Sequence, residues 1–328
     1  MHLRADGVKI YYLVADYAPQ SWGQGMLYEH VRILREAGIE AFALHHHAGF
    51  RPDWLDVDVP IKYIDEPGFS PSADDLVVVP EVQAESDVVQ RFAWRRVVFV
   101  QGSFLIFRGL QAHADYRELG YEDAMAVLPH VARVVERHFG VAAHVVPPFV
   151  APHFFEPPSA PRERRVLLAM KEGYRALGIS DQEVAQRLLS KEIGRRPGWS
   201  LTVLEGYSHR EVAGLMQSSM FLVNVYSHEA FNTTVPEAMA AGCIPICYDA
   251  RGGSDFLKPG VNAIVYPNQH VYEIVERVCE LVDQSDMLGD EFERLRRGGR
   301  ETAASFNADR TADALMRFFS RKLQLTPR

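Results

Sequence analysis

Residues 219–247 read SMFLVNVYSHEAFNTTVPEAMAAGCIPIC, and this stretch decides the fold class. The apolar, β-branched run 221–225 predicts a buried strand, and the apolar run 243–247 predicts a second one. Between them, hydroxyl residues precede Pro236, which suits the first turn of a short helix that ends at Gly242. A strand, a helix and a strand in this order are typical of a parallel α/β sheet.

Two glutamates lie eight positions apart in this stretch. Glu229 precedes the predicted helix, and Glu237 lies in its first turn. A helix that starts at the carboxyl end of a parallel strand offers unpaired N–H groups to a phosphate, and carboxylates accept hydrogen bonds from sugar hydroxyls. The stretch is therefore suited to hold a sugar, a ribose and a diphosphate together. The alternative is an ordinary strand–helix–strand unit with two solvated glutamates.

Size and composition bound the class of protein. A chain of 328 residues is longer than one typical core, which predicts two domains. The formal net charge of −8 argues against nucleic acid as a partner. Basic clusters at 95–96, 162–165 and 294–300 are expected to be solvated faces, with weak association to a membrane surface as the alternative.

Cysteine usage and apolar runs bear on the compartment. The three cysteines Cys243, Cys247 and Cys279 are too few for a disulfide framework, and two of them flank an apolar strand. They are expected to be reduced core residues. The first sixteen residues lack the long apolar core of a signal peptide, and no apolar run reaches the roughly 18–20 residues of a membrane span. We expect a cytoplasmic protein, with a peripheral position at the inner membrane face as the alternative.

The first half of the chain alternates between strand and helix patterns. Strand-like runs occupy 8–16, 39–47, 75–80, 95–101 and 141–148. An amphipathic helix is predicted over 26–38, after a glycine-containing loop, and a helix pattern also occurs within 121–140. This alternation predicts a doubly wound parallel sheet.

A proline-rich segment separates the two halves. Residues 147–161 hold six prolines, which is typical of a linker. The alternation then restarts, with expected elements at 164–171, 180–194, 199–207, 262–267, from about 271, and 306–323. Ser208 and Glu211 form a capping-box pattern at the start of a further helix. The expected domains are residues 1–150 and 151–305.

The sequence from Glu229 to Ile246 resembles a known family. Glu-x7-Glu, followed by Ala-Met-Ala-Ala-Gly and Ile-Pro-Ile, is similar to the donor-site signature of retaining nucleotide-sugar glycosyltransferases of the GT-B fold, group 1 or family 4-like. The resemblance covers the whole chain in layout and is motif-specific from about Leu201 to Pro267. It implies two Rossmann-like domains that face a cleft. The first would bind the acceptor, the second would bind the donor, and residues 306–328 would return as a helix to the N-terminal domain.

The resemblance also implies roles for residues near the signature. Glu237 would hold the ribose, and Glu229 would contact the donor sugar and serve catalysis. Backbone groups of Ala230, Phe231 and Asn232 would face the sugar, and the amides of Thr233, Thr234 and Val235 would meet the diphosphate. Lys171 and Arg175, four positions apart, would be the catalytic cations that stabilise the leaving diphosphate; two surface residues are the alternative. No metal and no cofactor is implied, and the nucleotide sugar is the substrate.

Three further donor-site positions come from the resemblance. Gly25, in the segment Trp22-Gly23-Gln24-Gly25, matches a glycine loop near the phosphate and acceptor, although a role in the turn alone is equally consistent. Gln101 stands where the family often has a histidine that contacts the sugar. Tyr207 follows a strand whose end often contacts the base; packing or capping is the alternative.

A run of three histidines, His45 to His47, invites a metal-site interpretation. Alternate side chains of a strand point to opposite faces, so adjacent histidines do not all reach one ion. No cysteine or acidic residue is close to them in the sequence. We therefore expect a strand end and loop here, and no metal site.

The expected activity is transfer of a sugar, with retention of configuration, to an acceptor hydroxyl on a glycan, a glycolipid or a small molecule, as in polysaccharide biosynthesis. The resemblance implies a front-face displacement rather than a covalent intermediate on Glu229. Two alternatives stay open: a nucleotide-sugar epimerase on the same fold, and a catalytically silent module that binds nucleotide sugars.

Overall fold

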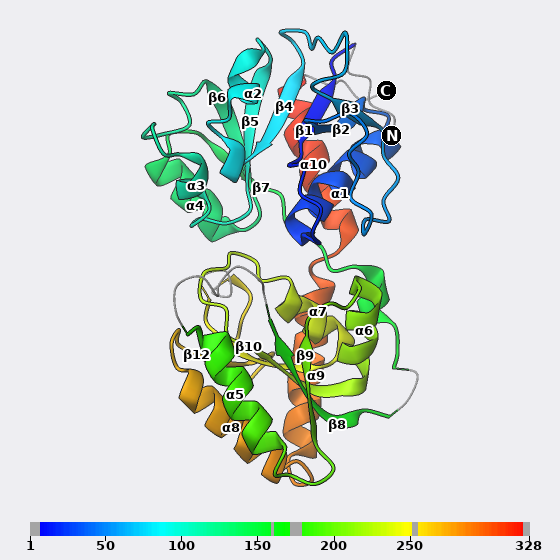
Figure 1. Cartoon of the computed structure of the whole chain (residues 1–328), viewed down its shortest axis with the longest axis vertical. Coiled ribbons are helices and arrows are strands. Elements are labelled where there is room, and N and C mark those ends of the chain that lie inside the picture. Colours follow the sequence, from blue (N-terminus) through cyan, green and yellow to red (C-terminus); the bar gives the residue numbers. More distant parts are fainter. Residues whose placement is uncertain (1–6, 159–160, 171–178, 251–254, 324–328) are drawn as a thin grey trace. The chain divides into compact units, whose positions relative to one another are not determined.

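The computed structural model describes residues 7–158, 161–170, 179–250 and 255–323. The chain divides into two compact units, shown in Figure 1. Unit 1 comprises Met1–Pro148 with Ala308–Arg328, and unit 2 comprises Phe149–Asn307. Each unit is a parallel α/β structure, so the predicted class is confirmed.

Unit 1 contains a parallel sheet in the order β3-β2-β1-β4-β5-β6-β7. The strands are β1 Ile10–Leu13, β2 Ala41–His45, β3 Ile61–Tyr63, β4 Leu76–Pro80, β5 Arg95–Val100, β6 Tyr121–Ala126 and β7 Ala143–Val145. The helices are α1 Trp22–Glu36, α2 Asp87–Arg91, α3 Ile106–Gly109, α4 Pro129–His138 and α10 Ala308–Lys322, with a 3-10 turn η1 at Glu81–Gln83. The central strands β1 and β4 are buried throughout, as their continuous apolar runs require.

The segment 121–126 forms strand β6, which the sequence does not separate from the helix pattern within 121–140. Its residues YEDAMA favour a helix locally, but β6 pairs in parallel with β5 on one side and β7 on the other. Pairing with two neighbouring strands outweighs the weak local preference for a helix, so the helix is confined to the later part of the range 121–140. The helix pattern further along is confirmed as α4.

Helix α10 belongs to unit 1, although unit 2 precedes it in the chain. It lies beside α1 (Figure 1), and Leu315, Phe318 and Phe319 on it are buried. The Thr311 hydroxyl donates to the Pro147 carbonyl at 2.8 Å. Hydrophobic burial and this bond together join the two ends of unit 1.

Unit 2 contains a parallel sheet in the order β12-β11-β10-β8-β9. The strands are β8 Glu163–Ala169, β9 Ser200–Leu204, β10 Ser219–Asn224, β11 Ile244–Tyr248 and β12 Ile264–Tyr266. The helices are α5 Asp181–Ile193, α6 His209–Ser218, α7 Thr234–Ala241, α8 Val271–Asp283 and α9 Gly289–Ala304, with a 3-10 turn η2 at Pro152–Phe155. On one face of the sheet, alternate residues such as Phe221 and Val223 pack with α5 and α8.

One residue of the basic cluster 162–165 is less solvated than the sequence predicts. Arg162 is half-buried and donates to the carbonyls of Met216 at 3.0 Å, Ser219 at 2.9 Å and Ala241 at 2.5 Å. It therefore satisfies carbonyls at the ends of α6 and α7, where a cation is also favoured by the helix dipoles. In the cluster 294–300, Arg294, Arg297 and Arg300 are exposed, as expected of a solvated face.

The proline-rich linker is ordered around one aromatic anchor. Residues Pro152–Phe155 form η2, and Phe154 is fully buried beside the neighbouring helices α6 and α7. The segment therefore packs as part of unit 2 and does not act as a flexible spacer in this part of its length.

Candidate functional site

The signature glutamate Glu237 lies in the first turn of α7, and the helix is buried from Val235 to Ala241. Its side chain is 7% exposed, and its Oε1 accepts a hydrogen bond from Nε2 of His209 at 2.8 Å. Burial raises the pKa of Glu237, and the bond from His209 opposes that rise. The carboxylate is thus held at the carboxyl edge of the unit 2 sheet by a residue from the neighbouring helix.

His209 is a site residue that the sequence prediction missed. It is the first residue of α6, and the predicted capping box before it is confirmed: the Ser208 side chain accepts from the N–H of Glu211, and Glu211 bonds back to Ser208. The contact with Glu237 spans 28 positions in the chain, so no local pattern points to it.

The loop between β10 and α7 is fixed by a pair of amides. Nδ2 of Asn232 donates to Oδ1 of Asn224 at 2.9 Å, and Nδ2 of Asn224 donates back to Oδ1 of Asn232 at 3.1 Å. Asn232 has φ of +41°, a left-handed conformation that asparagine tolerates better than most residues. Its side chain is therefore committed to the loop.

Phe231 is committed to packing in a similar way. Its ring lies 5.7 Å from the Phe256 ring and 4.9 Å from the Phe306 ring, and the latter two rings are 5.4 Å apart. This aromatic cluster anchors the loop.

The three backbone N–H groups that are predicted to bind phosphate differ in whether they already have a hydrogen-bond acceptor. The N–H of Val235 already donates to the carbonyl of Asn232 at 3.0 Å. Among the described residues, the N–H groups of Thr233 and Thr234 have no acceptor. Unpaired N–H groups at a helix start are the donors that an anion satisfies, so Thr233 and Thr234 suit a phosphate better than Val235 does.

The remaining predicted residues of unit 2 are distributed along the same edge. Glu229 is half-buried in the loop after β10, and Tyr207 is exposed in the loop after β9. Since both strands are parallel, these loops lie at the carboxyl edge of one sheet. Lys171 and Arg175 lie outside the described residues.

In unit 1, the structure brings the segment around Gly25 and Gln101 together. Trp22 to Gly25 form the first turn of α1 rather than a loop before it, which corrects the predicted helix start. Nε2 of Gln101 donates to the carbonyl of Gly23 at 3.2 Å, and a Cβ on Gly23 would lie 3.2 Å from the Gln101 oxygen. The glycine therefore permits a close approach between α1 and the end of β5.

A buried carboxylate holds Gln101 from behind. Oε1 of Glu81 accepts hydrogen bonds from the N–H of Gln101 at 3.1 Å and of Gly102 at 2.8 Å. Burial raises the pKa of Glu81 to about 7. Sequence reasoning missed Glu81, because its partners lie at least twenty positions away.

The histidine run has the acidic partner that the sequence did not reveal. Asp16, in the loop after β1, lies 2.9 Å from Nδ1 of His45 and 2.6 Å from Nδ1 of His47. Nε2 of His45 accepts from the hydroxyl of Tyr28 at 2.6 Å, so a buried chain of hydrogen bonds runs from α1 to the strand ends. Within the described ranges, no group of three acidic, histidine or cysteine side chains is arranged to hold a metal ion.

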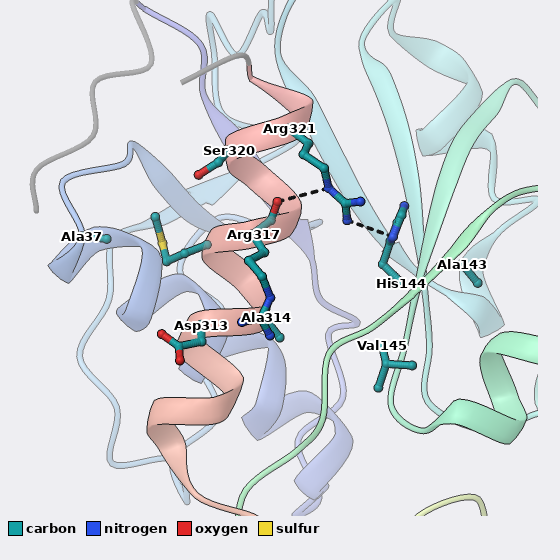
Figure 2. Close-up of a pocket in the computed structure, with 10 residues that line it drawn as sticks. Ala37, Ala143, His144, Val145, Asp313, Ala314, Arg317, Ser320 and Arg321 are labelled. Atoms are coloured by element: carbon teal, nitrogen blue, oxygen red, sulfur yellow. Dashed lines mark hydrogen bonds between the residues drawn. The ribbon is translucent and has the colours of Figure 1, made fainter. Parts of the chain in front are cut away.

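A groove of about 940 Å³ lies elsewhere in unit 1, between β7, α10 and the end of α1. Figure 2 shows Arg321 directed from α10 toward His144, whose Nδ1 lies 2.9 Å from Nη2 of Arg321. None of the predicted site residues lines this groove.

In the part of the chain that the structure describes, no helix is both long enough and apolar enough to cross a membrane.

Part of unit 2 matches a known protein family. Residues 189–302 match the family model of glycosyl transferases group 1, a range that includes Glu229 and Glu237. No curated protein sequence matches the chain.

Solved structures resemble the chain over nearly its whole length. A sucrose-phosphate synthase from Thermosynechococcus elongatus has a TM-score of 0.71 at 12% identity, covering 96% of this chain and 98% of its own. A glycosyltransferase from Rickettsia africae has 0.68 at 10%, with 97% and 99% covered. The E. coli trehalose-6-phosphate protein bound with UDP-2-fluoro glucose has 0.64 at 10%, with 98% and 100% covered. The predicted GT-B fold is therefore confirmed, and the segment 189–302 carries the similarity to glycosyl transferases group 1.

Proposed function

We propose that this protein is a retaining glycosyltransferase that moves a sugar from a nucleoside-diphosphate donor to an acceptor hydroxyl. The observation that carries the proposal is Glu237, a buried carboxylate in the first turn of α7 at the carboxyl edge of the unit 2 sheet. It lies inside the segment that matches glycosyl transferases group 1. A ribose presents two neighbouring hydroxyls, which such a carboxylate is suited to bind.

The diphosphate would lie at the start of α7. The unpaired N–H groups of Thr233 and Thr234 and the helix dipole supply positive potential there. Lys171 and Arg175 are proposed as the cations that complete this environment. Their charge would stabilise the diphosphate as it leaves, and stabilisation of developing charge commonly contributes more to catalysis than any other single effect.

Glu229 would contact the hydroxyls of the donor sugar, close to the bond that breaks. In the proposed front-face displacement, the acceptor hydroxyl attacks on the side of the leaving phosphate, and that phosphate takes the hydroxyl proton. Glu229 then orients the sugar and forms no covalent bond with it. We propose that no metal ion is required, because helix N–H groups and cationic side chains provide the charge stabilisation.

The acceptor side of the proposal rests on unit 1. Gln101 follows β5 at the carboxyl edge of that sheet, and Phe104, Leu105 and Phe107 next to it are exposed. An apolar surface directly after Gln101 favours an acceptor with an apolar portion, such as a glycolipid, over a bare sugar. With such an acceptor, we also propose weak association of the protein with a membrane surface.

The first experiment is thermal melting with UDP, GDP, ADP, TDP and CDP and with their common sugar conjugates. The E. coli relative was solved with a UDP sugar, so the uridine series is tested first. A ligand at about 100 times its Kd adds roughly 2.7 kcal/mol, which raises Tm by a few degrees. We expect one base series to stabilise the parent and Glu237→Ala to abolish the shift.

Product analysis then separates the proposal from its alternatives. With the stabilising donor and an acceptor panel, NMR of the product should show the anomeric configuration of the donor. Conversion of the donor without an acceptor would identify an epimerase. Tight donor binding without turnover on any acceptor would identify a silent binding module. No shift with any nucleotide would remove the donor-site assignment.

A further inference from the structure

His209 lies outside the Glu-x7-Glu signature, but it contacts Glu237. The His209 side chain is 22% exposed, and it reaches from the first position of α6 to Oε1 of Glu237. Among the described residues, Oε2 of Glu237 has no hydrogen-bond partner. One oxygen of the carboxylate is therefore paired, and the other keeps its capacity to accept a hydrogen bond.

His209 is itself held by aromatic neighbours from η2. Its ring lies 4.9 Å from the His153 ring at an interplanar angle of 90°, and 4.8 Å from the Phe154 ring at 63°. Phe154 is fully buried, so it forms a rigid wall behind the imidazole. Together with the capping box at Ser208, these contacts restrict the orientation of the ring before any ligand arrives.

We infer that His209 is a positioning residue for the donor: it keeps Glu237 ionised and oriented so that Oε2 accepts the ribose hydroxyls. The inference rests on the proposed function. A carboxylate this deeply buried binds a proton readily unless a donor stabilises its charge. A protonated Glu237 would lose acceptor capacity, and a rotated Glu237 would present its oxygens in the wrong direction.

Other charged groups near the pair are committed or distant. On α6, Arg210 and Glu211 are exposed, and Glu211 is bonded to Ser208. On η2, burial and the nearby His209 and Arg210 lower the pKa of His153, with Glu156 opposing. On α9, Arg300 lies beside Gly242 at the opposite end of α7. Within the described residues, His209 is the side chain that lowers the pKa of Glu237 against the effect of burial.

The test compares donor affinity across pH. The Kd of the most stabilising nucleoside diphosphate is measured by titration calorimetry from pH 6 to pH 9 for the parent, His209→Ala, His209→Gln, Glu237→Gln and the double variant that combines His209→Ala with Glu237→Gln. His270→Ala is the matched control, because His270 is a half-exposed histidine at the start of α8. Each Kd is divided by the parent value at the same pH, which cancels the titration of the diphosphate itself.

We expect His209→Ala to weaken binding about tenfold at pH 6, and less at pH 9, because Glu237 ionises without help once the pH exceeds its raised pKa. His209→Gln, which keeps an N–H donor, should recover most of the affinity, and His270→Ala should match the parent. In a Glu237→Gln background, removing His209 should cost little and show no pH dependence.

Two results would overturn the inference while the proposed function survives. One is unchanged affinity of His209→Ala at every pH, with Glu237→Ala still defective. The other is an equal loss at every pH without rescue by glutamine, which would indicate a merely structural role. If the parent binds no nucleotide, the proposed function and the inference fail together. Melting curves of each variant exclude misfolding as the cause of a loss.

Discussion

At the residue scale, several side chains near the proposed donor site serve the loop rather than the ligand. Asn232 bonds to Asn224, and Phe231 packs against Phe256 and Phe306. In the proposed site, the groups left to bind a nucleotide sugar are the backbone of this loop and the carboxylates of Glu229 and Glu237, at the two ends of the Glu-x7-Glu pattern. The strained φ of Asn232 is consistent with this division, because backbone strain persists only where surrounding contacts enforce it.

A buried histidine in unit 1 makes stability depend on pH. His30 is fully buried, and neither ring nitrogen has a hydrogen-bond partner among the described residues. Burial lowers its pKa to about 3, from 6.5. In the unfolded chain the His30 imidazole therefore binds a proton below pH 6.5. In the folded chain it binds one only below about pH 3.

The contribution of His30 to stability is fully present above pH 6.5 and is lost as the pH falls toward 3. We expect the free energy of unfolding to decrease by up to about 1.4 kcal/mol per pH unit from this group. His30→Leu should flatten that slope in urea denaturation between pH 4 and pH 6.5. An unchanged slope in the variant would show that the acid sensitivity comes from other groups.

At the element scale, α9 packs closely against its neighbours, and this packing positions α7. A Cβ on Gly298 would lie 2.2 Å from the carbonyl oxygen of Val261, and one on Gly299 would lie 3.3 Å from the Met239 side chain. The pair of glycines thus allows α9 to pack closely on α7 and on the loop after Lys258. The position of Glu237 depends on this packing, because α7 is buried on all sides from Val235 onward.

Two glycine substitutions should therefore have opposite effects. We expect Gly298→Ala to destabilise the protein by about 1–3 kcal/mol, because the added methyl forces α9 outward. Gly214→Ala in α6 is the matched control, since a Cβ there meets nothing within 4 Å. It should stabilise by about 0.5–1 kcal/mol through helix propensity. Equal effects of the two changes in chemical denaturation would contradict the proposed packing constraint.

At the scale of the whole molecule, a chain of 328 residues forms two parallel α/β units and crosses between them twice. Unit 2 carries the match to glycosyl transferases group 1, and the GT-B fold extends over the whole chain. In unit 1, the buried carboxylate of Glu81 and the amide of Gln101 organise the carboxyl edge of the sheet. Both sheets thus present loops at the edge where open parallel sheets bind ligands.

Metal removal tests the proposed chemistry at this scale. Charge on the leaving diphosphate is assigned to helix N–H groups and to Lys171 and Arg175, so a chelator should change neither binding nor turnover. We expect the thermal shift with the preferred donor and the rate of sugar transfer to be the same in EDTA and in added Mg²⁺ or Mn²⁺. Loss of turnover in EDTA with recovery by one cation would contradict the metal-free proposal.

The sequence by itself determined the features that depend on neighbours along the chain. Runs of β-branched residues predicted the buried strands, Ser208 with Glu211 predicted a helix start, and the spacing of Glu229 and Glu237 placed them on either side of a helix start. These features follow from local periodicity, capping and spacing, which act over a few residues.

Only the tertiary structure decided the pairings between distant residues. The strand at Tyr121–Ala126, the bond from His209 to Glu237, the approach of Gln101 to Gly23 and the acidic partner of His45 and His47 all join segments far apart in the chain. Local preferences are weak, about 1 kcal/mol or less per residue, so strand pairing and burial override them. The two signature glutamates could be identified in the sequence. The burial of Glu237 and its hydrogen bond from His209, which shift the pKa of Glu237, exist only in the folded chain.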